Sequence, residues 1–137
     1  MTEAEIFKQN ILEFNRQLDP AIIQTTNLEK LTGLKPDAII EIGMGGSGTP
    51  GAILQNIADY AIVNVPVLNW RDGVLPSHPF KNPLYIVVSY SGNTRESLAA
   101  LAEIIKRQQM VAVVASSPAF GGAGGGQGGG TLLQEAQ

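Results

Sequence analysis

The stretch LYIVVSYSGNT, residues 84–94, decides the fold. Its apolar first half is typical of a buried strand, and a helical pattern begins near Arg95, directly after it. The hydroxyl residues and the glycine of its second half therefore occupy a strand-to-helix junction. Such a loop can direct Ser and Thr hydroxyls and backbone N–H groups at one anion, with the positive end of the helix dipole behind them. We predict that this loop binds phosphate.

The helix after this loop offers a plain structural use for some of the same residues. Thr94 is placed to cap it, and capping alone would account for Thr94 and Ser91, because Ser and Thr are common helix caps. Both residues therefore keep two possible roles. In the first turn, Arg95 faces solvent or reaches the ligand, and we expect Glu96 to face solvent.

A second strand-to-helix junction lies upstream. Residues 38–42, AIIEI, form a short apolar run that predicts a buried strand. The run leads into the glycine-rich stretch GMGGSGTPG, residues 43–51, and then into a helical pattern with Pro50 in its first turn. Glycines at such a turn let a ligand approach the backbone closely.

Two more apolar runs, residues 61–68 and 110–115, predict two further strands. Apolar strands that alternate with helices or long loops predict an α/β fold: a doubly wound parallel sheet with helices on both faces, as in a flavodoxin-like three-layer sandwich. Ligands of such sheets bind outside the carboxyl ends of the strands, at the switch point. Both loops lie at carboxyl ends, so one ligand could contact both.

Composition limits the classes of protein to consider. A net charge of -3 offers no basic surface for nucleic acid, and the absence of cysteine excludes a disulfide framework and a thiol nucleophile. The N-terminus is acidic, which is unlike a signal peptide. No apolar run has the ~20 residues that a membrane span needs. We expect a soluble, cytoplasmic protein without nucleic-acid or membrane partners.

The chain is expected to form one globular domain at residues 37–137, preceded by a helical segment at residues 1–36. That segment should contain a helix at residues 3–18, started by the capping pair Thr2 and Glu5, and a weaker helix at residues 21–31. Both helices would cover one side of the core or a partner chain.

Two other classes of enzyme match the glycine stretch in part. Gly43, Gly45 and Gly48 fit the dinucleotide fingerprint of a Rossmann oxidoreductase that binds NAD, but the next strand ends in NWR, residues 69–71, and Asp72 lies past the position of the ribose-binding acid. A nucleophile elbow would need a glycine where Thr49 stands. The chain's one histidine, His78, lies in a proline-flanked loop, and its role stays open.

Two motifs together resemble the sugar isomerase (SIS) domain superfamily. IGMGGSG, residues 42–48, resembles its first glycine loop, and VSYSGNTRES, residues 88–97, resembles its Ser/Thr phosphate loop. Their pairing, roughly 45 residues apart with strands between, is more specific than either motif alone. The residues of both motifs, with Trp70 between them, are most similar to those of the bifunctional phosphoglucose/phosphomannose isomerases.

The resemblance implies a phosphosugar site in an SIS-like sandwich. Ser89, Ser91 and Thr94 would hold the phosphate, and Gly46 and Ser47 would line the sugar or phosphate edge. The full set of binding residues is then Gly45, Gly46, Ser47, Ser89, Ser91, Asn93 and Thr94.

The reaction of such enzymes converts glucose 6-phosphate or mannose 6-phosphate to fructose 6-phosphate through a cis-enediol, with a carboxylate base. No metal or organic cofactor is implied. SIS domains usually pair, so a homodimer or a second SIS domain is expected.

The chain departs from that family in its catalytic residues. The glutamate, histidine and arginine that act in those isomerases match no position here, and neither Glu41 nor Glu96 matches a family base. The catalytic residues are therefore unknown. The chain could be the first half of an isomerase, a half completed by a partner, or a non-catalytic module that binds or senses a sugar phosphate.

The C-terminal stretch is a second difference from that family. Residues 117–130 are rich in glycine and suggest an insertion or linker. Residues 129–136, GGTLLQEA, resemble the turn and short apolar helix that follow the fourth strand in the family.

Overall fold

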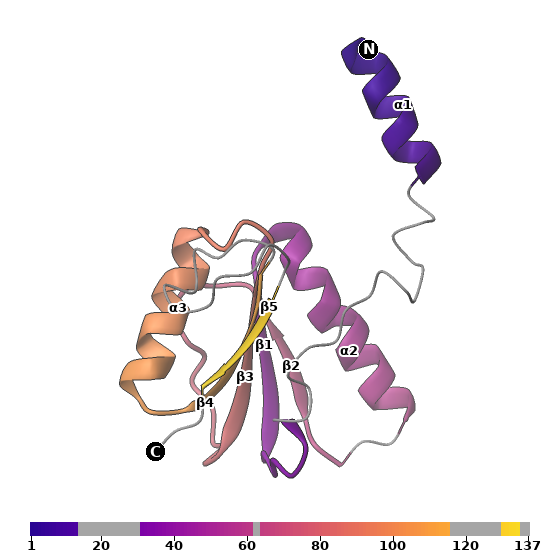
Figure 1. Cartoon of the computed structure of the whole chain (residues 1–137). Coiled ribbons are helices and arrows are strands. Elements are labelled where there is room, and N and C mark those ends of the chain that lie inside the picture. Colours follow the sequence, from indigo (N-terminus) through magenta and orange to yellow (C-terminus); the bar gives the residue numbers. More distant parts are fainter. Residues whose placement is uncertain (14–30, 62–63, 116–129, 135–137) are drawn as a thin grey trace.

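The computed structural model describes residues 1–13, 31–61, 64–115 and 130–134 (Figure 1). Up to residue 115, its strands are separated by helices or, at residues 71–82, by a loop, as the sequence predicts. In chain order they are α1 (Glu3–Glu13), β1 (Ala38–Gly43), η3 (Gly45–Gly48), α2 (Thr49–Tyr60), β2 (Val67–Trp70), β3 (Pro83–Ser89), α3 (Arg95–Lys106), β4 (Met110–Ala115) and β5 (Gly130–Gln134).

The strands form one sheet in the order β2-β1-β3-β4-β5. The strands β2, β1, β3 and β4 are parallel, with Glu41 of β1 opposite Asn69 of β2 and Ile86 of β3. Because β1 is followed by β2 on one side and β3 lies on the other, the chain order reverses between β1 and β3. The parallel α/β sheet is therefore confirmed, and its switch point lies beside β1.

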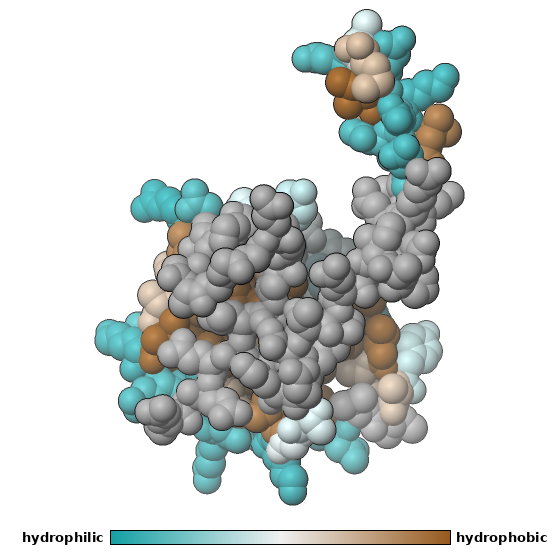
Figure 2. All heavy atoms as spheres, in the orientation of Figure 1, coloured by the Kyte–Doolittle hydropathy of each residue, from teal (hydrophilic) through white to brown (hydrophobic). Residues whose placement is uncertain are grey.

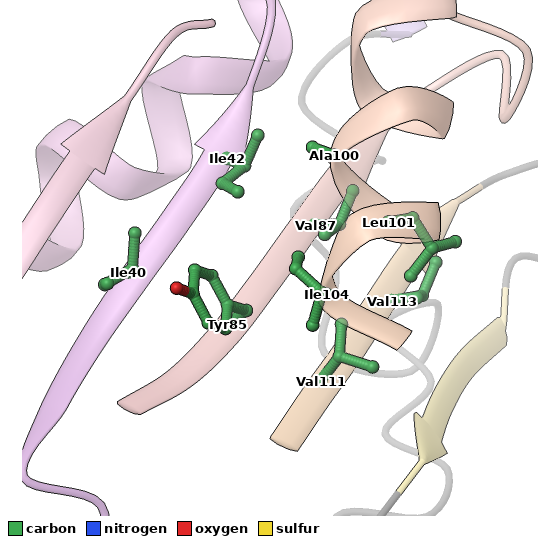
Figure 3. Packing of buried hydrophobic residues seen from close by; sticks show 9 residues of the cluster. All are labelled: Ile40, Ile42, Tyr85, Val87, Ala100, Leu101, Ile104, Val111 and Val113. Carbon is green, nitrogen blue, oxygen red and sulfur yellow. The ribbon is translucent and has the colours of Figure 1, made fainter. Parts of the chain in front are cut away.

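Helices cover the two faces of the sheet, as Figure 1 shows for α2 and α3. One face packs its apolar side chains against Ala100, Leu101 and Ile104 of α3 (Figure 3). The strand residues of this core are Ile40, Ile42, Tyr85, Val87, Val111 and Val113. Side chains alternate along a strand, so Glu41, between two isoleucines of this face, lies on the face that α2 covers.

The helix α1 does not contribute to this core. Thr2 and Glu5 form the predicted capping box: the Thr2 N–H donates to Glu5 Oε2 at 2.7 Å, and the Glu5 N–H donates to Thr2 Oγ1 at 3.3 Å. However, α1 has no buried residue, and apolar side chains lie on its surface (Figure 2). Among the described residues, α1 therefore covers no part of the core, and its covering of a partner chain stays a prediction. Most of the second predicted helix, residues 21–31, lies outside the described residues.

The strand predicted at residues 61–68 is wrong in its position. The helix α2 continues to Tyr60, and β2 begins at Val67. Pairing with β1 sets these bounds, since the Ile39 N–H donates to the Pro66 carbonyl at 2.8 Å and β1 then pairs with β2 up to Trp70. The strand therefore starts later than predicted, but Asn69 and Trp70 lie at its end, as expected for a strand that ends in NWR.

The C-terminal helix expected at residues 129–136 is also wrong. Residues 130–134 form β5, which pairs antiparallel with β4 and places Gly130 opposite Ala115. The physical reason is the open edge of β4, whose backbone N–H and C=O groups accept another strand. Most of the glycine-rich stretch at 117–130 lies outside the described residues. No helix in the described part of the chain combines the length and apolar character needed to cross a bilayer.

Candidate functional site

The two predicted loops meet at the carboxyl edge of the sheet, between β1 and β3. One follows β1 and contains η3, and the other follows β3 and leads to α3. The backbone N–H of Tyr90 donates a hydrogen bond to Ser47 Oγ at 3.3 Å, which joins them. The structure therefore places the glycine loop and the Ser/Thr loop side by side at the switch point.

Three hydroxyl groups of the Ser/Thr loop lie together. Thr94 Oγ1 lies 3.1 Å from Ser89 Oγ and 3.4 Å from Ser91 Oγ. Ser89 is buried, and its Oγ also accepts the N–H of Gly92 at 3.1 Å, while Ser91 Oγ accepts the N–H of Asn93 at 3.2 Å. Side-chain capping by Thr94 is therefore wrong: Thr94 occupies the N-cap of α3, but its hydroxyl makes no capping bond and turns to the two serines.

The glycine loop has an open part and a packed part. Gly45 and Gly46 are exposed, with nothing within 4 Å of where a Cβ would be, and Gly45 has a positive φ of 55°. Gly43 instead packs against the backbone carbonyl of Ser47, and Gly48 against that of Gly43. A ligand can therefore approach the backbone at Gly45 and Gly46, whereas Gly43 and Gly48 allow the loop to fold back on β1.

A polar network lies beneath the glycine loop. Asn69 Nδ2 donates to the Gly48 carbonyl at 2.6 Å and to Glu41 Oε2 at 3.0 Å. Asn69 Oδ1 accepts a hydrogen bond from Arg71 Nε at 3.1 Å, and Arg71 Nη2 donates to the same Gly48 carbonyl at 3.3 Å. The Gly48 carbonyl is therefore tied to the end of β2 through two side chains, and Glu41 is the buried end of the network.

The carboxyl group of Glu41 is an unusual buried acid. The residue is 1% exposed, and its Oε1 has no hydrogen-bond partner among the residues that the structure describes. Burial raises its pKa to about 7, against the opposing effect of the nearby Arg71 charge. The sequence motifs did not predict this role, although a charged residue inside an apolar run predicted as a buried strand was a signal for it.

Other polar residues that the sequence drew attention to lie apart from the loops or bond locally. His78 Nε2 lies 2.8 Å from the Tyr85 hydroxyl, near the amino end of β3, and its ring stacks on Phe80. Asp72 Oδ1 accepts the N–H of Val74 at 3.0 Å within its own turn. Glu96 is exposed, as predicted.

No protein-family profile matches the chain. Four curated relatives do match it, and all four share the name bifunctional phosphoglucose/phosphomannose isomerase. The protein from Thermoplasma volcanium is 39% identical over 77 residues, which are 56% of this chain and 24% of the relative. The Aquifex aeolicus protein is 36% identical over 69 residues, 50% of this chain and 22% of the relative.

The protein from Thermoplasma acidophilum is 41% identical over 69 residues, 50% of this chain and 21% of the relative. The matches therefore span about a quarter or less of each of these relatives. They agree with the resemblance that the two loop motifs indicate. Over about half of its length, this chain is similar to the bifunctional phosphoglucose/phosphomannose isomerases.

Proposed function

We propose that this chain is a phosphosugar-binding SIS domain of an isomerase that converts glucose 6-phosphate or mannose 6-phosphate to fructose 6-phosphate. The observation that carries the proposal is the Tyr90 to Ser47 hydrogen bond, which brings a glycine loop and a Ser/Thr loop together at the switch point of the sheet. The similarity to phosphoglucose/phosphomannose isomerases supports a phosphorylated hexose as the ligand.

The chemistry of the loops suits a phosphate dianion. The hydroxyl groups of Ser89, Ser91 and Thr94 now bond to one another or to backbone N–H groups, and a hydroxyl hydrogen can rotate toward an anion. The exposed backbone at Gly45 and Gly46 adds a face that a ligand can approach. Hydrogen bonds to a charged acceptor are stronger than the neutral ones that they replace.

The same geometry favours binding without turnover. Isomerisation needs a base that moves a proton between two carbons of the open sugar. Within the described ranges, Glu41 is shielded beneath α2, and His78 is paired with Tyr85 near the other end of β3. We therefore propose that a second SIS domain or a partner copy supplies the base. A regulatory module that only binds the sugar phosphate is the second candidate function, and the same observation favours it.

Calorimetric titration with fructose 6-phosphate tests the proposal. We expect binding that is tighter than that of inorganic phosphate, with no glucose 6-phosphate formed in the same sample. Glucose 6-phosphate formed in that sample would mean that a partner copy of this chain supplies the base, and its absence would leave that role to a second SIS domain. Binding of NAD in place of the sugar phosphate would instead favour the dinucleotide alternative.

Sedimentation at micromolar concentration tests the pairing. A homodimer is expected if a second copy completes the site. A monomer at these concentrations would contradict self-association and favour a second SIS domain as the partner.

A further inference from the structure

Glu41 lies beneath the glycine loop of the proposed site but is not one of the groups that would contact the ligand. Its carboxyl is buried under the first turn of α2, where Gly51 packs against Glu41 Oε2. Its Oε1 faces the space beside Gly43, 2.7 Å from where a Cβ of that glycine would be, and no group in the described part of the chain bonds to it. A buried carboxylate with an unused oxygen is costly, so its presence needs a reason.

The network above Glu41 determines the orientation of the Asn69 amide. The nitrogen of this amide faces two acceptors, Glu41 Oε2 and the Gly48 carbonyl, and its oxygen faces Arg71 Nε. A flipped amide would place its oxygen against both acceptors. Glu41 therefore selects the orientation in which Asn69 holds the end of the glycine loop and also holds Arg71.

We propose that Glu41 is a positioning residue of the phosphate site, which anchors the glycine loop through Asn69 and takes up a proton when a phosphate dianion binds. This inference rests on the proposed function. The positive charge of Arg71 acts on the negative charge of Glu41, and a dianion at the loops would add negative charge at the same edge of the sheet. Protonation of Glu41 removes the repulsion between its carboxylate and the dianion. The positive charge of Arg71 then attracts the ligand alone.

The surroundings of Glu41 contain few competing groups. Among the described residues, Arg71 is the charged side chain that acts on the Glu41 carboxyl. On α2, the ionisable residues are Asp59 and Tyr60, more than two turns beyond Gly51, and η3 has none. The pKa of about 7 means that near neutral pH the carboxyl can still gain a proton from solvent.

Calorimetry of the whole chain with fructose 6-phosphate, at about pH 7.5 in two buffers with different ionisation enthalpies, measures the proton directly. We expect the chain to take up a fraction of a proton on binding. The ligand cannot produce this sign, because a phosphate monoester with a second pKa of about 6 releases protons when its dianion is bound. Glu41→Gln should bind the ligand without the uptake, and the exposed Glu96→Gln, which removes the same charge, should retain it.

The outcomes separate this inference from the proposed function. Binding without proton uptake by the unmodified chain, or uptake that persists in Glu41→Gln, would overturn the role of Glu41 and leave sugar phosphate binding intact. Absence of binding would overturn both. Should Glu41→Gln not fold, the carboxyl ¹³C shift of Glu41 in the unmodified chain reports the same proton: its titration should move to higher pH with ligand, and an unmoved titration would overturn the inference.

Discussion

Gly51 lies against the carboxyl group of Glu41 so closely that no Cβ fits between them. This contact brings the start of α2 down onto β1, and it covers the one carboxyl group among the described residues that is almost fully buried. The glycine of helix α2 and the glutamate of strand β1 are therefore parts of one packing arrangement beneath the glycine loop.

Gly51→Ala should destabilise the fold. Its Cβ would overlap Glu41 Oε2 and Asn69 Nδ2, so α2 must shift or the network must open. Overpacking of this kind costs about 1–3 kcal/mol of the free energy of unfolding. Urea unfolding measures the loss. Gly46→Ala is the matched control, since its Cβ meets nothing within 4 Å. Equal stability of the two variants would contradict the close contact.

Glu41→Gln should change how stability depends on pH. A carboxyl whose pKa is higher in the folded than in the unfolded chain binds its proton more tightly when folded. Its contribution to stability is therefore complete below pH 4.5 and is lost as pH rises through about 7. The difference between these two values corresponds to about 3 kcal/mol.

The variant lacks this titration, so at about pH 8 it should be more stable than the unmodified chain by about that amount, and near pH 4 the two should be alike. Urea unfolding at both pH values measures the difference. Glu96→Gln should show no such crossover, because its side chain is exposed. Parallel pH profiles for Glu41→Gln and the unmodified chain would contradict the raised pKa.

Ser89→Ala should weaken fructose 6-phosphate binding by about 1–3 kcal/mol if its hydroxyl contacts the dianion. It should also lower stability by about 1 kcal/mol, because the buried hydroxyl accepts the Gly92 N–H. Calorimetry and urea unfolding of the same sample separate the two effects. Ser91→Ala, at an exposed position, should weaken binding with little effect on stability. Unchanged affinity in a folded Ser89→Ala would leave that residue a structural role alone.

Ser47→Ala should loosen the link between the loops. It removes the acceptor of the Tyr90 N–H, so the loops lose a bond that orients one relative to the other. We expect binding of fructose 6-phosphate to weaken by about 1 kcal/mol. Calorimetry tests this against Ser77→Ala, an exposed serine of another loop. Equal affinities for the two variants would mean that the Ser47 bond does not organise the site.

The strands and helices next to the loops followed from sequence because their patterns are local. Residues 38–42 and 84–88 are apolar runs, and both lie inside the strands that the structure contains. The start of β2 could not be predicted from the sequence. Pairing with β1 decides where β2 begins, and no residue within 61–70 shows which of them pair with β1. The strand β5 was missed for the same reason: its backbone pairs with β4, and such pairing leaves little trace in side-chain pattern.

The sequence by itself determined the class of fold, the two glycine and hydroxyl loops, and the relationship to phosphoglucose/phosphomannose isomerases, because each depends on residues close together in the chain. Only the tertiary structure decided that Thr94 turns its hydroxyl to Ser89 and that Glu41, Asn69 and Arg71 form one network under the glycine loop. These contacts depend on distance in space. Glu41, Asn69 and Arg71 come from β1, from β2 and from the turn after β2, which parallel pairing brings together and linear order separates. Thr94 and Ser89 are close in the chain, and their contact depends on how the loop between them folds.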